Sequence, residues 1–187
     1  MTPLEYWRSG EGLAHITPPG CPKPEGIDFA AELRHASGPG LVCEFGCGVG
    51  RLAPLFEPRW YVGLDVCPAA IARARAACPD HQFEVIGDDG LLWVAEATFA
   101  HTVMLHVPDE ALDATIARFA SPRIVVSEIM GRRWRRDGLP PVFNREAVEY
   151  VAVFAAHGFR LLDTRSVPYP RYRETDLTIL VFERGRS

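Results

Sequence analysis

The sequence predicts a single-domain α/β fold: a mostly parallel, seven-stranded sheet with helices on both faces and an antiparallel hairpin at its C-terminal end. Five short apolar runs, each typical of a buried strand, alternate with segments of helical spacing. Two further strand-like runs, separated by a loop, follow them. At 187 residues, with 48% hydrophobic and 24% charged residues, the chain has the size and composition of one globular domain.

Composition excludes several classes of protein. The formal net charge of −4 gives no general attraction to nucleic acid or to an anionic membrane. No basic, apolar leader is seen in residues 1–20, and no apolar run approaches the roughly 20 residues that a membrane span requires. The five cysteines are odd in number and lack a C-x-x-C spacing, which favours buried thiols over disulfides or a metal site. We therefore expect a cytoplasmic protein without a metal.

Two helices are expected before the first strand. The first covers Thr2–Arg8, with a proline in its first turn, and the second covers Asp28–Ser37, whose apolar residues have helical spacing. Residues 10–26 between them are rich in glycine and proline and indicate an irregular loop.

The first strand leads into the most informative stretch of the chain. The apolar run Leu41–Cys43 meets the acid Glu44 and then the glycine-rich turn Gly46–Gly50, and the helix-like segment Arg51–Phe56 follows. Glycines let the backbone approach a ligand closely, and a helix N-terminus offers unpaired N–H groups. This combination is typical of a nucleotide-type ligand site.

The spacing in the turn restricts the ligand. A dinucleotide fingerprint, G-x-G-x-x-G, would require glycine where this chain has Arg51. Glu44, two residues before Gly46, would repel a phosphate and attract an ammonium group. The turn therefore favours a ligand with adenosine at one end and a cationic amino acid at the other, such as S-adenosylmethionine.

The second strand is expected at Trp60–Val66 and carries Asp65 near its end, 19 residues after Gly46. An acid at this position commonly accepts hydrogen bonds from the two ribose hydroxyls of a bound nucleoside. Helix Ala69–Ala77 should follow.

The third and fourth strands are expected at Gln82–Gly87 and Phe99–Val107, with a helix beginning near Pro108 or Asp109. The later elements are a fifth strand, a helix and two final strands, expected at Arg123–Ile129, Glu146–His157, Phe159–Val167 and Asp176–Glu183. Asn144 is expected to cap the last helix.

Together these features resemble one protein family. Glu44–Arg51, EFGCGVGR, resembles the first motif of the Rossmann-like (class I) S-adenosylmethionine-dependent methyltransferases, and Leu105–Asp109, LHVPD, resembles the segment after their fourth strand. The resemblance covers Leu41–Glu183 and implies a Rossmann-like fold. It also implies a methyltransferase core at residues 41–187, with residues 1–40 as an N-terminal helical cap over the cofactor site.

The resemblance implies S-adenosylmethionine as cofactor and S-adenosylhomocysteine as product. The residues expected to bind the cofactor are Glu44, Gly46, Cys47, Gly48, Arg51, Asp65, Val66, Asp88, Asp89 and Leu105. In the family, an acid at the position of Asp88 or Asp89 commonly bonds the adenine amine; which of the two does so is left open, as is a role in capping a turn.

The methyl acceptor is expected beside His106, which is either a catalytic base, a substrate contact or only part of the cofactor pocket. The residues expected to bind the substrate are Tyr6, Trp7, Arg132, Arg133, Trp134 and Tyr169. Arginine forks bind carboxylates and phosphates, so this set predicts an anionic group on the acceptor; a solvated loop and aromatic packing on the sheet are the alternatives.

We therefore expect direct in-line methyl transfer to the oxygen or nitrogen of a small metabolite, by a monomer or homodimer. The motifs of DNA amino-methylating and cytosine-carbon enzymes are absent, because the chain has LHVP after its fourth strand and no Pro-Cys pair. The alternatives are an RNA methyltransferase and a non-catalytic S-adenosylmethionine sensor or interaction module. A dehydrogenase is disfavoured by Arg51.

Overall fold

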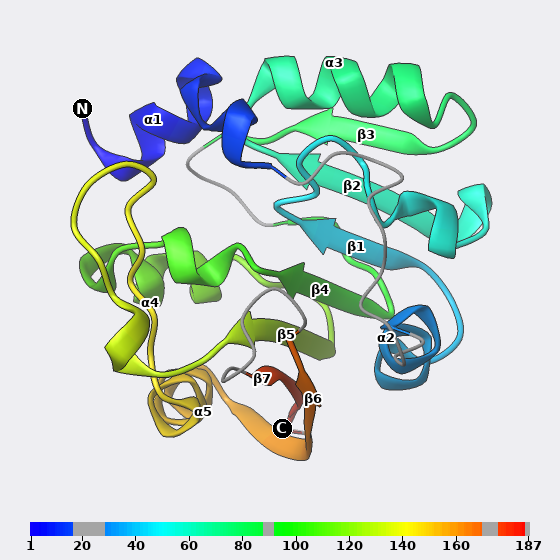
Figure 1. The fold of residues 1–187 in the computed structure, drawn as a ribbon. Helices are drawn as coiled ribbons and strands as arrows, with labels where there is room; N and C mark the ends of the chain where they lie inside the picture. Colours follow the sequence, from blue (N-terminus) through cyan, green and yellow to red (C-terminus); the bar gives the residue numbers. More distant parts are fainter. Residues whose placement is uncertain (17–28, 88–91, 170–175, 186–187) are drawn as a thin grey trace.

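The computed structural model describes residues 1–16, 29–87, 92–169 and 176–185, which fold around one seven-stranded sheet (Figure 1). The strands are β1 (Val42–Phe45), β2 (Tyr61–Asp65), β3 (Gln82–Val85), β4 (Ala97–His101), β5 (Arg123–Ile129), β6 (Phe159–Pro168) and β7 (Asp176–Arg184). The α-helices are α1 (Pro3–Ser9), α2 (Phe29–Ser37), α3 (Pro68–Ala77), α4 (Asp109–Ala117) and α5 (Ala147–Ala156). Short 3₁₀ turns are η1 (Glu11–His15), η2 (Ala53–Leu55), η3 (Pro58–Trp60), η4 (Met104–His106) and η5 (Arg132–Trp134).

The strand order is β3-β2-β1-β4-β5-β7-β6, and the four pairs among β1 to β5 are parallel. β7 is antiparallel to both β5 and β6, with Arg123 opposite Glu183 and Phe159 opposite Arg184. The predicted α/β fold, with its mostly parallel sheet and final antiparallel hairpin, is confirmed.

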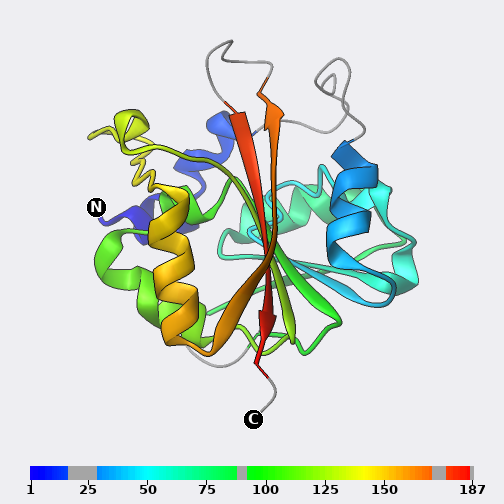
Figure 2. The same cartoon turned by 90° about the horizontal axis from the view of Figure 1, so that it is seen from below.

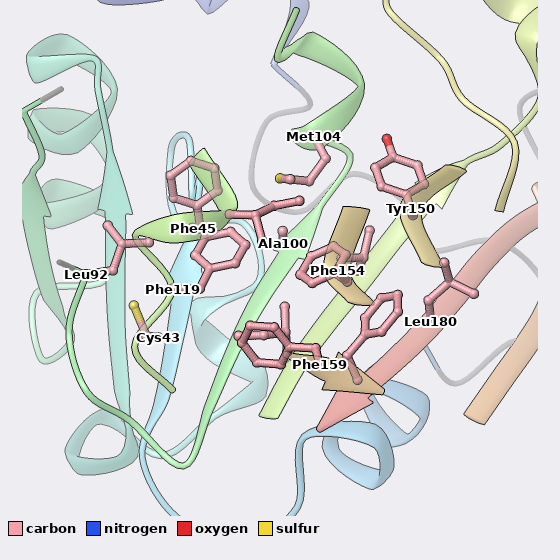
Figure 3. Close-up of a cluster of buried hydrophobic side chains, with 14 of the residues drawn as sticks. Cys43, Phe45, Leu92, Ala100, Met104, Phe119, Tyr150, Phe154, Phe159 and Leu180 are labelled. Carbon is pink, nitrogen blue, oxygen red and sulfur yellow. The ribbon is translucent and has the colours of Figure 1, made fainter. Parts of the chain in front are cut away.

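Helices cover both faces of this sheet, and Figure 2 shows α5 and α2 on opposite sides of it. On one face, Phe154 of α5 stacks on Phe182 of β7 with ring centroids 4.2 Å apart, and Phe119 lies next to it (Figure 3). On the other face, Leu33 of α2 packs in a buried cluster with Phe99 of β4. The faces separate because successive side chains of a strand point in opposite directions.

Residues 1–40 contribute to two different parts of the molecule. α2 is part of the sheet packing, through Leu33 and Ala36. α1 and η1 lie apart from it, near the C-terminal ends of the parallel strands (Figure 1). The boundary between a cap and a core at residue 40 stays a prediction.

The expected helix Arg51–Phe56 was wrong, because only the three-residue turn η2 forms there. Pro54 lies in this turn and Pro58 opens η3; proline has no N–H to donate, and it disfavours helical backbone in the residue before it. The glycine turn therefore leads into irregular backbone and not into the N-terminus of an α-helix.

Other details also differ from the prediction. The third strand ends at Val85 and not at Gly87. The fourth strand ends at His101, because Thr102 has a positive φ of 50° and the chain then forms η4. Helix α5 is capped by Glu146, through a reciprocal capping box with Glu149, and not by Asn144. The Asn144 amide instead donates to the carbonyl of Ile129.

Within the described ranges, no helix combines the length and the apolar character that crossing a bilayer would need.

Candidate cofactor and methyl-acceptor site

A cavity of about 570 Å³ lies at the C-terminal ends of the parallel strands. Its floor is built from residues that end or follow β1, β2, β3 and β4, and its walls come from α1, η1 and one side of α4. In Figure 1 the arrowheads of β1, β2 and β4 point towards the side where α1 lies. Ligands of open α/β sheets bind in this position, where the strand order reverses between β1 and β4.

The glycine turn forms the floor of the cavity. The N–H groups of Gly46 and Cys47 both donate to the carbonyl of Leu64, at 2.8 and 2.9 Å, and this joins the turn to β2. Gly46 has a φ of 76°, and a Cβ atom there would lie 2.3 Å from Cγ2 of Val103. Only glycine fits this position, because it permits the left-handed backbone and the close approach of the loop after β4.

Asp65 stands at the end of β2 and lines the cavity. Its Oδ2 accepts from the N–H of Gly48 at 2.8 Å, and its Oδ1 accepts from the N–H of Cys67 at 2.9 Å. Burial raises the pKa of this carboxyl, while the backbone donors Cys67 and Gly48 act to lower it. Each carboxylate oxygen has two lone pairs, so Asp65 can accept further hydrogen bonds from a diol in the cavity.

Glu44 lines the cavity from β1, and only 3% of its surface is exposed. It accepts a hydrogen bond from the hydroxyl of Tyr61 on the neighbouring strand β2. Burial raises the pKa of Glu44 to about 7, against the hydrogen bond from Tyr61 and the positive charge of Arg51. A buried acid of this kind gains a stable negative charge when a cation binds next to it.

Val66 and Ile86, which follow β2 and β3, line the cavity beside Asp65 and give it an apolar end. The guanidinium of Arg118 donates to the carbonyl of Gly87 at 2.9 Å and holds the start of the next loop. Asp88 and Asp89 lie outside the described residues, so their predicted contact with adenine stays a prediction.

His106 also lines the cavity, from η4. Its Nδ1 is 2.8 Å from the carbonyl oxygen of Pro141. Because a carbonyl can only accept, Nδ1 carries the proton and Nε2 keeps a lone pair. Burial lowers the pKa of His106 to about 4, so the ring is neutral near pH 7. The indole of Trp7 packs against this ring, with centroids 4.5 Å apart.

The structure brings most of the predicted site residues to this cavity. Those that line it are Trp7, Glu44, Gly46, Cys47, Gly48, Arg51, Asp65, Val66 and His106. Predicted residues that are described but do not line it are Tyr6, Leu105, Arg132, Arg133, Trp134 and Tyr169.

These last residues have other contacts. Tyr6 is buried edge-on against Trp7, with centroids 5.3 Å apart, and Leu105 is buried. Arg132 forms an ion pair with Glu149. Tyr169 packs against the cluster under α2. Their assignments to cofactor or substrate stay predictions without support from this cavity.

Several lining residues were missed at the sequence level. Ala111, Ala114, Thr115 and Arg118 line the cavity from one side of α4 and the residue after it. Their spacing of three and four residues places them on one helical face, so the sequence contained that signal.

His101 and His15 were also missed. His101 ends β4 and its Nδ1 lies 3.2 Å from Oγ of Ser127. Burial lowers the pKa of His101 to about 3. A histidine at the end of an apolar run was a signal for His101, whereas nothing local marked His15.

No family model matches the chain. Among curated proteins, it is 32% identical over 102 residues to a trans-aconitate 2-methyltransferase from Escherichia coli O139:H28, a match that covers 50% of this chain and 40% of that protein. The chain thus spans about two fifths of the length of the curated relatives it matches.

Solved structures resemble nearly the whole chain. Magnesium protoporphyrin IX methyltransferase from Synechocystis PCC 6803, solved with bound S-adenosylhomocysteine, has a TM-score of 0.71 at 18% identity and covers 97% of both chains. Together with the strand order described above, this match identifies the fold. This chain has the class I S-adenosylmethionine-dependent methyltransferase fold. The predicted resemblance is therefore confirmed.

The class I methyltransferase fold does not by itself determine a reaction. The cyclase SpnF matches this chain with a TM-score of 0.72 at 14% identity, covering 100% of this chain and 97% of that one. Function must therefore be argued from the cavity and its residues.

Proposed function

We infer that this protein is an S-adenosylmethionine-dependent methyltransferase that acts on the oxygen or nitrogen of a small molecule. The observation that carries this proposal is the placement of Glu44 and Asp65 in one cavity, on either side of the glycine turn. A buried carboxylate suits an ammonium group, and a second carboxylate at the end of β2 suits a ribose diol. The trans-aconitate methyltransferase relative and the methyltransferase of similar fold support the same reading.

The cavity residues fit the cofactor along its whole length. Glu44 would hold the amino group of its methionine part, Asp65 the ribose hydroxyls, and Val66 with Ile86 the flat adenine ring. A bound S-adenosylmethionine supplies a methyl group that its sulfonium already activates. The work left to the chain is to hold the acceptor in line and to exclude water, which can supply roughly 7–11 kcal/mol in favourable cases.

His106 is the residue we assign to the acceptor. Its Nε2 lone pair can take the proton that a hydroxyl or N–H acceptor loses as it is methylated. The neutral ring is ready for this role near pH 7, because burial keeps the pKa of His106 at about 4. Trp7 packs beside it and would hold a planar acceptor by its face.

The acceptor end favours a largely apolar molecule with one proton-bearing oxygen or nitrogen. Leu4, Val107 and Pro108 line the cavity together with Trp7 and His106. Arg132, one of the arginines that suggested an anionic acceptor, pairs with Glu149, and the nearby Arg135 donates to Asp109 at 2.6 Å. An anionic acceptor, such as the relative's name implies for that protein, would have to meet Arg51, Arg118 or His15 instead.

The deciding experiment is isothermal calorimetry with S-adenosylmethionine, S-adenosylhomocysteine and NAD in turn, followed by a screen for S-adenosylhomocysteine formation. We expect binding of both adenosyl compounds and none of NAD, and turnover with neutral phenols, enols or heterocyclic amines. Turnover only with polycarboxylates would shift the acceptor class to anions. Binding of NAD alone would overturn the proposal.

Substitution of Asp65 tests the assigned cofactor contact. Asp65→Ala should weaken S-adenosylhomocysteine binding by on the order of 2–3 kcal/mol, because a charge-assisted hydrogen-bond acceptor is lost. Asp80→Ala, which changes an exposed acid between α3 and β3, should bind normally. Equal affinity of both variants would reduce Asp65 to a support for the glycine turn.

A second candidate is a protein that binds S-adenosylmethionine without transferring its methyl group. The fold likeness to SpnF, a cyclase by its name, is the observation that favours it. Such a protein would bind S-adenosylmethionine as tightly as a methyltransferase would, but it would form no S-adenosylhomocysteine with any small molecule in the screen. An arm with bulk RNA distinguishes the remaining alternative, an RNA methyltransferase.

A further inference from the structure

The loop that carries His106 is held in place by hydrogen bonds to a part of the chain that is distant in sequence. We call residues 103–109 the acceptor loop and residues 131–145, which connect β5 to α5, the brace. The N–H of Phe143 donates to the carbonyl of Leu105 at 2.6 Å, and Nδ1 of His106 donates to the carbonyl of Pro141 at 2.8 Å. The partner that sets the tautomer of His106 therefore belongs to the brace.

Arg145, the last residue of the brace, makes three hydrogen bonds to this loop through its guanidinium, and only 2% of its surface is exposed. Its Nη1 donates to the carbonyl of Met104 at 3.1 Å, its Nη2 to the carbonyl of Val107 at 2.7 Å, and its Nε to Oδ1 of Asp109 at 2.9 Å. One rigid, planar guanidinium thus fixes both ends of η4 and the first turn of α4.

Other groups also hold Arg145 and the acceptor loop in place. The carbonyl of Arg145 accepts from the N–H of Gly131 at 2.9 Å, and its guanidinium lies 5.8 Å from the ring centroid of Tyr150. In addition, Oε1 of the buried Glu128 accepts from the N–H groups of Val103 and Met104, at 2.9 and 2.7 Å. An acid on β5 and the guanidinium of the brace thus both hold the acceptor loop.

A buried arginine is costly to desolvate, so its contacts must be well formed to be tolerated. The three guanidinium hydrogen bonds described above end on the acceptor loop, and in the chain His106 lies between Met104 and Val107, the two residues whose carbonyls Arg145 holds. Movement of these carbonyls would move the imidazole relative to Pro141 and to the cavity. Lysine could not reproduce these contacts, because its single ammonium lacks the planar fork.

We propose that Arg145 is a positioning residue for methyl transfer: it fixes the acceptor loop so that His106 keeps its Nδ1 proton on the Pro141 carbonyl and its Nε2 lone pair towards the cavity. The proposal rests on the proposed function only for the reaction itself. It also gives the arginine-rich segment a role. Arg135 shares Asp109 with Arg145 and so helps to hold the acceptor loop. It lies next to Arg132, Arg133 and Trp134, which the sequence had suggested as substrate contacts.

The test compares Arg145→Lys and Arg145→Met with the wild type by ¹⁵N NMR of histidine-labelled protein, which reports the tautomer and the pKa of each imidazole. We expect His106 to lose its single Nδ1–H tautomer and its pKa to rise towards the ordinary value of 6.5. His81, whose Nε2 lies 3.1 Å from the carbonyl of Phe56, serves as internal control and should keep its signals. An unchanged tautomer and pKa of His106 in a folded Arg145 variant would overturn the proposal.

Two further variants complete the test, one as a control and one as a substitute for the Arg145 variants. Arg160→Met removes an exposed arginine that pairs with Glu183 at 2.7 Å, and it should leave His106 unchanged. If both Arg145 variants fail to fold, Asp109→Asn removes the carboxylate that Arg145 and Arg135 share, from a side chain that is 54% exposed. It should shift the pKa of His106 in the same direction by a smaller amount, and no shift would count against the proposal.

Ligand binding and turnover separate this proposal from the proposed function. Affinity for S-adenosylhomocysteine should change by no more than about twofold in Arg145→Lys, as is usual for sites without shared partners. With an acceptor from the screen, kcat should fall by roughly 10- to 100-fold, because misplacement of a catalytic group acts on the chemical step. If the wild type neither bound S-adenosylhomocysteine nor methylated any acceptor, the proposed methyltransferase function would be wrong. The NMR result would still decide the role of Arg145.

Discussion

At the scale of single residues, the buried carboxyl of Glu44 is the clearest link between sequence and ligand. It comes from β1, lies beside the glycine turn, and accepts a hydrogen bond from Tyr61. Burial raises its pKa to about 7, so in the folded protein without ligand the Glu44 carboxyl is partly protonated and partly ionised near neutral pH. A cationic ligand group would shift the balance to the charged form.

This gives a prediction for ligand affinity. Binding of S-adenosylhomocysteine, which carries an amino group, should strengthen as pH rises through about 7, by up to about tenfold per pH unit below that value. The sign follows because Glu44 must release its proton before it can pair with an ammonium. Calorimetry at a series of pH values, in buffers of different ionisation enthalpy, measures both the affinity and the proton release.

The variant Glu44→Gln is the matched test. It keeps an oxygen to accept from Tyr61 but cannot ionise, so its affinity should be lower above pH 7 and should lose this dependence on pH. Glu57→Gln, which changes an exposed glutamate, should behave as the wild type. A wild-type pH profile retained in Glu44→Gln would remove Glu44 from the assigned contact.

At the same scale, local patterns identified some site residues and missed others. Asp65 could be predicted because its distance from the glycine turn is set by one strand–turn–strand unit. Trp7 and His106 were both predicted from the sequence as site residues. Their contact with each other could not be predicted, because they are 99 residues apart along the chain. No local pattern reveals a contact between residues so distant.

At the scale of elements, the N-terminal segment α1–η1 determines the shape of the acceptor end. Thr2 and Glu5 form a capping box that begins α1, and Trp7 of this helix reaches His106. Gly12 packs so closely on the indole that a Cβ atom at this residue would lie 2.3 Å from Cε3 of Trp7. These contacts place α1 beside His106, and the closure of this segment over a cofactor stays a prediction.

Limited proteolysis tests that closure. Trypsin can cut after the exposed Arg8 only when α1 opens, so we expect S-adenosylhomocysteine to slow this cleavage, by up to about 100-fold at a ligand concentration of about 100 Kd. Mass spectrometry of the released N-terminal fragment measures the rate. Cleavage at the same rate with and without ligand would separate the segment from cofactor binding.

The variant Gly12→Ala should displace Trp7 and remove most of this protection. Gly185→Ala is its control, since a Cβ atom at residue 185 would make only an ordinary contact, 3.5 Å from the carbonyl oxygen of Gly158. Full protection of Gly12→Ala would mean that Trp7 does not hold the segment closed.

At the scale of the whole molecule, the parallel sheet forces buried polar groups into pairs across its C-terminal edge. Glu128 on β5 is fully buried and accepts the backbone N–H groups of Val103 and Met104, which the end of β4 leaves without a strand partner. Burial raises the pKa of Glu128 to about 8, against the hydrogen bonds from Met104 and Val103. The acid is therefore mostly neutral in the folded protein near pH 7.

Folding stability should depend on pH accordingly. Between the ordinary pKa of 4.5 and about 8, the folded protein holds a proton on Glu128 that the unfolded chain has lost. The contribution to stability is therefore complete below pH 4.5 and lost as pH rises through about 8. Glu44, with its pKa raised to about 7, adds a loss of the same sign.

In Glu128→Gln, a neutral side chain can still accept the two N–H groups. The fall in the free energy of unfolding with rising pH should become shallower, by up to about 1.4 kcal/mol per pH unit in this window. Urea denaturation at a series of pH values measures the slope, and Glu57→Gln should leave it unchanged. An unaltered slope in Glu128→Gln would show that this carboxyl ionises as readily in the folded protein as in the unfolded one.

The sequence by itself determined the order of the elements, the parallel sheet with its final hairpin, the glycine turn and the acid Asp65. These depend on apolar periodicity, on glycine and proline, and on short spacings, which act over a few residues. Its errors came at places where local signals compete, as at Arg51–Phe56, where prolines ended the predicted helix.

Only the tertiary structure decided which side chains meet. Asn144 was expected to cap a helix and Arg145 was given no role, yet the first ties the brace to β5 and the second holds the acceptor loop. The arginine-rich stretch read as a binding surface, but Arg132 and Arg135 pair with acids of α5 and α4. The physical reason is that buried polar groups must find partners wherever the packed elements bring them, and the sequence does not record those distances.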